Sequence, residues 1–193
     1  GFQVIRYDGR GTGSSDRAAR DFSLEATLRD LEAVVDGLDL EHFALVGHLS
    51  GVLTAIAYAA RHSERVSHLV LRNPYASVAD YGVFPGRRAL KALRPVAEEN
   101  WELVTVNAAH LDFGFTDSEL AREYAAALQS AMSAAVWVER GEAYDGIDVT
   151  ELLGAVKAPT LIIYDTGIRG TRPAAEGDLR AAATKVTAAI PGA

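Results

Sequence analysis

Short apolar runs alternate with amphipathic stretches along this chain, and the two patterns predict different elements. The strand-like runs are residues 2–7, 43–46, 66–71 and 158–164. The helical patterns are residues 24–38, 51–62 and 176–189. The first helix has leucine or valine at helical spacing and a serine, Ser23, where an N-cap is expected. Strands that alternate with helices in this order predict an α/β fold with a mostly parallel sheet.

The middle of the chain, residues 74–150, has helical patterns and no convincing strand. The helices expected there are residues 87–107, with Pro95 breaking or starting a helix, then 116–138 and 148–155. We therefore expect a single domain over residues 1–193. Its core comes from residues 1–73 and 151–193, and residues 74–150 form a helical lid over the carboxyl edge of the sheet.

Four basic residues lie at helical spacing near the start of this predicted lid: Arg87, Arg88, Lys91 and Arg94. A run of like charges on one helix face is usually a solvated surface. We expect no binding role for it.

Composition narrows the function classes. The 193 residues are 49% hydrophobic and 23% charged, which is typical of a folded globular chain, and the net charge is −7. An acidic chain is a poor match for nucleic acid, which is bound through clustered lysine and arginine. The absence of cysteine excludes disulfides, thiol nucleophiles and thiolate metal sites. No apolar run is long enough to span a bilayer and no basic leader is seen, so we expect a cytoplasmic protein with no membrane partner.

A glycine-rich loop, residues 8–16, follows the first strand-like run. A dinucleotide-binding fingerprint needs glycine at its first, third and sixth positions, where a helix opens. Gly9 and Gly11 fit, but Ser14 occupies the last position and the next helix begins only at Ser23. The other interpretation is a structural turn. The incomplete spacing favours the turn, and no cofactor is expected.

The most informative stretch is the turn between the run at 43–46 and the helix at 51–62. A strand, a tight turn and a helix, with glycines two residues on either side of a central position, make the pattern of a nucleophile elbow. Gly47 and Gly51 supply the small flanks, and the central residue is Leu49. A register with Ser50 at the centre would place His48 and Val52 at the flanks, and both are bulky for a strained turn.

The histidines and other possible metal ligands do not indicate a catalytic or metal site apart from the elbow. A lone histidine such as His48 or His110 is more often a packed polar residue than a catalyst. No His-x-x-x-His or Glu-x-x-His pairing lies on one helix face, so no metal is expected.

Four stretches in this order resemble the α/β-hydrolase superfamily. They are Asp8-x-Arg10-Gly11-x-Gly13-x-Ser15, Val46-Gly47-His48-Leu49-Ser50-Gly51, Arg61-His62-Ser63-Glu64-Arg65-Val66 and Ala158-Pro159-Thr160-Leu161. The chain is similar in particular to bacterial hydrolase domains that occur alone or fused to adenylate cyclases and transcriptional regulators, which share the stretch RYDGRGTG. The resemblance implies a structural role for the motif residues Asp8, Arg10, Gly11, Gly13, Ser15, Gly47 and Gly51.

The same resemblance implies a carboxylic-ester-type hydrolase, but it places Leu49 in the nucleophile slot and Ile168 in the acid slot. The substitutes that the sequence offers are weak: Ser50, Asp165 and His48. The backbone N–H of Ser50 would be one oxyanion donor. The family's second donor lies in a loop before Phe2, and its histidine follows a strand beyond Ala193.

We therefore expect a catalytically silent member of the family. The alternative is a sensor module of the same fold that binds a small ligand or a partner. The partners this allows are a small apolar or ester-like molecule, a fused domain or a second copy of the chain.

Overall fold

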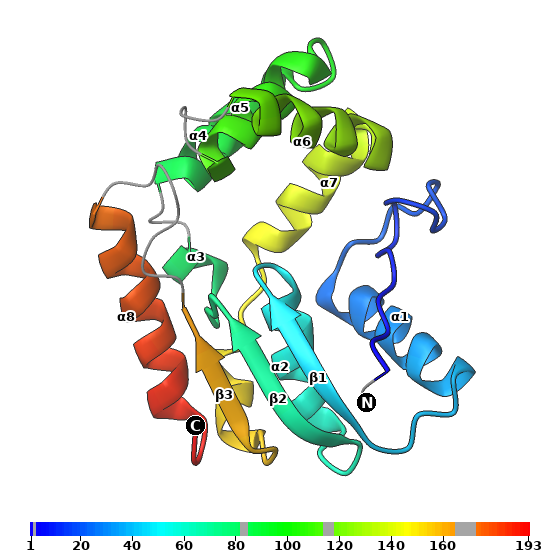
Figure 1. Ribbon diagram of the computed structural model, residues 1–193, viewed down its shortest axis with the longest axis vertical. Coiled ribbons are helices and arrows are strands. Elements are labelled where there is room, and N and C mark those ends of the chain that lie inside the picture. The colour runs from blue at the N-terminus through cyan, green and yellow to red at the C-terminus, as the bar shows by residue number, and fades with distance from the viewer. Residues whose placement is uncertain (2, 82–84, 114–117, 165–172) are drawn as a thin grey trace.

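In the described part of the chain, three parallel strands form a sheet in the order β1 (Phe43–His48), β2 (Val66–Arg72) and β3 (Thr160–Ile163) (Figure 1). The computed structural model describes residues 1, 3–81, 85–113, 118–164 and 173–193. In the sheet, Val46 lies opposite Val70, and Val70 lies opposite Leu161. The predicted α/β class with a parallel sheet is confirmed.

One face of the sheet packs against helices. They are α1 (Leu24–Gly37), α2 (Gly51–Arg61), the 3₁₀ helix η2 (Thr150–Ala155) and α8 (Pro173–Ala189). Helix α2 is the centre of this core, because every residue from Val52 to Ala59 is buried. Its small alanines let it lie close to the strands, and the predicted stripe of α1 is buried from Leu28 to Val35. Leu38 falls outside the stripe, since the helix ends at Gly37 and leaves that side chain 50% exposed.

The other face of the sheet, which we call the open face, has no helix of the described part of the chain packed against it. Figure 1 looks onto it, with the strands drawn in front of α2. The side chains on this face are Ala44, Val46, His48, His68, Val70, Arg72, Leu161 and Ile163. Val46 is 66% exposed and Leu161 56% exposed. Parallel sheets are normally covered on both faces, and among the described residues this face leaves apolar side chains such as Val46 and Leu161 exposed.

Charged pairs fasten α1 to the end of α2. Arg61 binds both oxygens of Glu25 at 2.8 and 2.6 Å, and His62 lies 3.0 Å from Glu32. Arg65 donates to Asp36 at 2.6 Å and to the carbonyl of Leu40 at 3.0 Å. The stretch Arg61–Val66 therefore closes the helix pair in this structure.

The segment between β2 and β3 is helical, as the sequence predicts. Its helices lie above the carboxyl ends of the strands in Figure 1. They are α3 (Val78–Tyr81), α4 (Pro85–Leu93), the 3₁₀ helix η1 (Arg94–Val96), α5 (Trp101–Phe113), α6 (Ser118–Ala131) and α7 (Ala134–Asp145). None of the helices in the described part of the chain combines the length and apolar character needed to cross a bilayer.

The predicted helix boundaries in this segment need adjustment. Pro95 does interrupt the first pattern, because it lies in η1 between α4 and α5. The second pattern is two helices, since the chain turns at Met132 and Ser133 caps α7 by accepting from the Val136 N–H. The expected helix over 148–155 is the 3₁₀ helix η2.

The strand predicted over residues 2–7 is wrong for the described residues 3–7, which form no strand. Val4 is 79% exposed and Ile5 39% exposed, and no ladder joins this segment to β1. Strand-forming residues become a strand only where a neighbouring strand pairs with their backbone. Here the segment passes beside α1, on the side of β1 away from β2 (Figure 1).

The prediction of a merely solvated basic face is also wrong for Arg94, whereas Lys91 is 63% exposed. Arg94 donates to the two carboxylate oxygens of Asp145 at 2.7 and 3.2 Å, and Lys91 lies 2.9 Å from the same carboxylate. The Arg94 side chain is only 13% exposed, and a Cβ on Gly141 would lie 2.7 Å from its guanidinium. These contacts join α4 and η1 to α7.

We expect the Asp145 carboxylate to stabilise this helix contact by about 2 kcal/mol, because removing it leaves a largely buried guanidinium without its partner. The Arg94 hydrogen bond, helped by Lys91, holds the pKa of Asp145 well below its usual range. A lowered pKa contributes stability above the ordinary aspartate pKa, and that contribution is lost as the pH falls below about 4.

Urea unfolding of Asp145→Asn at several pH values tests this expectation. The variant should be less stable than wild type at pH 7, and the difference should shrink in acid. Glu142→Gln, on an exposed residue of the same helix, is the matched control and should leave stability unchanged. A difference independent of pH would show that the ion pair is not the source of the effect.

Candidate elbow and cavity

The turn after β1 has the geometry of an elbow with Leu49 at its apex. Leu49 has φ +50°, in the left-handed region that few non-glycine residues adopt. Its N–H donates to the carbonyl of Arg72 at 3.3 Å, and its carbonyl accepts from the N–H of Val52 at 3.0 Å. Bonds to β2 on one side and α2 on the other hold the strained residue in place.

Ser50 lies beyond the strained position. Its φ of −59° and ψ of −27° are right-handed helical values, and it is the N-cap of α2 without a side-chain cap bond. The register with Leu49 at the centre is therefore the one that the backbone adopts. The Ser50 N–H has no acceptor among the described residues, which leaves it available to a ligand oxygen.

The two flanking glycines differ in what they do. A Cβ on Gly47 would lie 2.9 Å from the Cβ of Ala55 and 3.0 Å from the Cα of Val52, so the strand and the helix approach too closely for a side chain. A Cβ on Gly51 would meet nothing within 4 Å. The requirement for a small residue, expected at both flanks, holds in this structure at Gly47 and not at Gly51.

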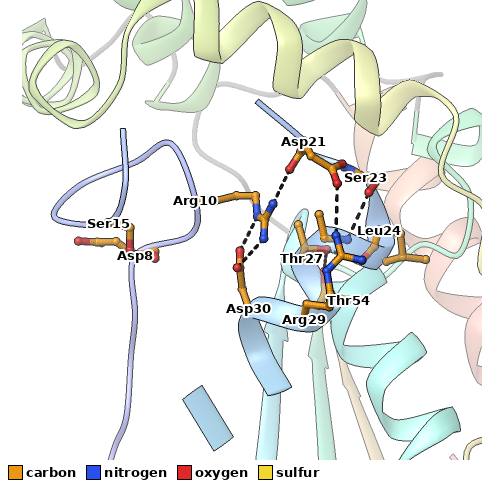
Figure 2. Close-up of polar contacts among 11 residues, drawn as sticks. Asp8, Arg10, Ser15, Asp21, Ser23, Leu24, Thr27, Arg29, Asp30 and Thr54 are labelled. Atoms are coloured by element: carbon orange, nitrogen blue, oxygen red, sulfur yellow. Dashed lines mark hydrogen bonds and ion pairs between the residues drawn. The ribbon is translucent and has the colours of Figure 1, made fainter. Parts of the chain in front are cut away.

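The glycine-rich loop is held by its own motif residues. Figure 2 shows Arg10 between two acidic partners: it donates to both oxygens of Asp30 at 2.7 Å each, and to the backbone carbonyl of Asp21 at 2.9 Å. Asp8 accepts from the Ser14 N–H with its carboxylate and from the Ser15 hydroxyl with its carbonyl. The Arg10–Asp30 pair fixes the loop to α1, and the Asp8 contacts close the loop on itself.

Two glycines of this loop have backbone conformations that suit glycine. Gly11 has φ +75°, and a Cβ there would lie 2.9 Å from Phe22 and Val136. Gly13 has φ +55°, and its N–H donates to the carbonyl of Ala131 at the end of α6. The loop therefore links the sheet side of the molecule to the helices above it.

Of the other predicted site residues, His48 lies at the elbow itself, directly before Leu49. Asp165 and Ile168 lie outside the described residues. His110 is on α5, in the helical segment, and His48 is the last residue of β1. Among the described residues, no group of three metal-ligating side chains is close enough to hold an ion.

A cavity of about 320 Å³ lies beside the elbow. It is lined by β1 and the start of α2, including His48 and Ser50, and by residues from three other parts of the chain. Those residues are Tyr7 and Gly9 of the N-terminal segment, Thr27, Asp30 and Leu31 of α1, and Arg140 and Tyr144 of α7.

Tyr7, Arg140 and Tyr144 are not predicted as site residues from the sequence, because they share no motif and come from distant segments. Burial raises the pKa of the Tyr7 hydroxyl, and the charge of Asp30 adds to the effect. The hydroxyl is therefore a protonated donor at neutral pH.

Known families and proteins that resemble this chain are hydrolases or share the hydrolase fold. A family model described as "alpha/beta hydrolase fold" matches residues 1–167. Epoxide hydrolase 3 of Xenopus tropicalis is 37% identical over 75 residues, which are 38% of this chain and 20% of that protein. A putative carbamate hydrolase, RutD, of Escherichia coli O157:H7 is 35% identical over 78 residues, 40% of this chain and 29% of that protein. The matches thus span less than a third of these two relatives.

Solved structures share the fold over nearly the whole chain. The enol-lactonase of Burkholderia xenovorans LB400 matches with a TM-score of 0.69 at 24% identity, over 97% of this chain and 68% of its own. An esterase of Exiguobacterium antarcticum matches with a TM-score of 0.76 at 20% identity, over 96% and 68% respectively. At these identities the likeness shows the fold alone.

Proposed function

The chain belongs to the α/β-hydrolase fold family. From this premise we propose that it is a member of the family that does not hydrolyse esters. The observation that carries the proposal is Leu49 at the strained apex of the elbow, with φ +50°. In this fold the apex residue supplies the attacking atom, and a leucine side chain has no lone pair to attack a carbonyl.

Ser50 is the nearest hydroxyl to the apex along the chain, and its position argues against its use as a nucleophile. It has helical φ and ψ values and begins α2. A nucleophile also needs a base within hydrogen-bond reach to remove its proton. The Ser50 hydroxyl makes no hydrogen bond to a histidine among the described residues.

The second candidate function is binding of a small molecule in the cavity beside the elbow. Its volume of about 320 Å³ is near the lower end of the range of small-molecule sites. The named relatives act on epoxides, on carbamates in a putative assignment, and on enol lactones. For this chain we therefore propose a small ester-like molecule or its hydrolysis product as the ligand class.

Two assays on the purified chain test the silent elbow. Turnover of p-nitrophenyl acetate and butyrate should stay at the buffer rate. A fluorophosphonate probe should leave the protein unlabelled by mass spectrometry. Ser50→Ala is the matched control and should behave like wild type in both assays. Labelling at Ser50 that disappears in Ser50→Ala would overturn the proposal.

A further inference from the structure

The cavity beside the elbow is surrounded by hydrogen-bond donors that lack acceptors. Arg140, Tyr7 and Tyr144 all line it. Neither tyrosine hydroxyl makes a hydrogen bond within the described part of the chain, although Tyr144 is only 8% exposed; Tyr7, at 43%, is open to solvent on one side. Donors grouped around a cavity without acceptors favour a ligand that brings acceptor oxygens.

Arg140 supplies a fixed positive charge at this cavity. Its guanidinium lies 5.7 Å from the centre of the Tyr144 ring, and it forms no ion pair with the described residues. The adjacent carboxylate, Glu139, is directed to Arg20 at 3.7 Å. An arginine stacked on an aromatic ring keeps its N–H groups available in the plane, where they match a carboxylate.

The acidic residue that lines the cavity does not cancel this charge. Both oxygens of Asp30 are bound by Arg10 at 2.7 Å, so the pair is neutral as a unit. Arg140 is therefore the lining cation whose charge is not neutralised by a described partner. A ligand of negative charge fits this balance.

The threonine hydroxyls at the cavity have no hydrogen to give. Thr27 donates to the carbonyl of Leu24 at 2.9 Å, and its oxygen lies 3.1 Å from that of Thr54. Because the Thr27 hydrogen is already used, Thr54 is the donor between the two. Apart from Ser50 at the elbow, the donors left for an anion are the Arg140 guanidinium and the two tyrosine hydroxyls.

We propose that this cavity binds a small carboxylate, with the anion on Arg140 and the hydroxyls of Tyr7 and Tyr144. The apolar body of the ligand lies against Leu31, Leu45 and Ala55, which line the same cavity. The inference rests on the ligand-binding function proposed above and names its ligand class. A carboxylate is also the product that ester or lactone hydrolysis leaves.

Calorimetric titration with benzoate, and with neutral benzamide of the same shape, tests the inference on the whole chain. Benzoate should bind and benzamide should bind about tenfold more weakly or not at all. Arg140→Gln should weaken benzoate about tenfold or more. Tyr144→Phe, which keeps the ring beneath the guanidinium, should weaken it by a smaller factor. Arg122→Gln, the same charge change at an exposed residue of α6, should leave binding unchanged.

Three results would overturn the carboxylate site: no benzoate binding at millimolar concentration, equal binding of benzamide, or equal weakening by Arg122→Gln. If Arg140→Gln fails to fold, two other measurements decide whether the site exists: the affinity of Tyr144→Phe for benzoate, and the difference between benzoate and benzamide with the wild-type protein. This test is independent of the proposal that the elbow is inactive. If benzoate does not bind, the carboxylate site is refuted, but the results of the ester assays do not change. Fluorophosphonate labelling of Ser50, in turn, would leave the carboxylate site standing.

Discussion

Purified protein of residues 1–193 should self-associate rather than elute as a single monomer. The open face carries Val46, 66% exposed, beside Leu161, 56% exposed, with Val70 between them in register. The outer edge of β1 adds backbone groups that no described strand pairs with, because among the described residues β1 is the first strand of the sheet and its partner is β2. Exposed apolar sheet surface and an unpaired edge both promote association.

Size-exclusion chromatography with light scattering measures this effect. The mass of the wild-type protein should rise with concentration, and Val46→Lys combined with Leu161→Lys should shift it towards monomer. Leu38→Lys is the matched control, since Leu38 is 50% exposed after α1 and lies off the sheet. A sharp wild-type monomer peak with a cooperative melt above about 55 °C would refute the prediction.

Leu49→Ser alone should leave ester hydrolysis at background, although it restores a hydroxyl at the apex of the elbow. A serine hydroxyl is a weak nucleophile until a base takes its proton. His42 precedes β1, His62 follows α2 and His68 is in the middle of β2, so none of these three lies at the carboxyl edge with residue 49. A triad that lacks one member loses a factor on the order of 10⁴ in rate.

Initial rates with p-nitrophenyl esters, together with a search for burst kinetics, measure this effect. Leu49→Gly is the matched control, because glycine adopts φ +50° without strain. It should raise stability by about 1 kcal/mol and remain inactive. A burst in Leu49→Ser that is absent in Leu49→Gly would mean that a base exists in this chain. His48 and His110 would then be the residues to replace first.

Local sequence patterns were sufficient for most elements of this fold. The apolar run at 43–46 became β1, and the stripe from Leu28 to Val35 became the buried side of α1. These elements are set by neighbours in the sequence: a period of 3.6 or of two residues decides which side chains share a face. The residue at position 49 is likewise a fact of the sequence, and with it the absence of an attacking group at that position.

Where a local sequence pattern was compatible with more than one structure, only the tertiary structure decided which one forms. Residues 3–7 have strand-forming side chains, but a strand also needs a partner, and none pairs with them here. Arg94 looked solvated because its partner, Asp145, lies 51 positions further along the chain. The cavity donors are the clearest case. Tyr7 and Arg140 lie 133 positions apart in the sequence. Only the packing of α1, β1 and α7 brings them to one cavity, and no sequence periodicity encodes that.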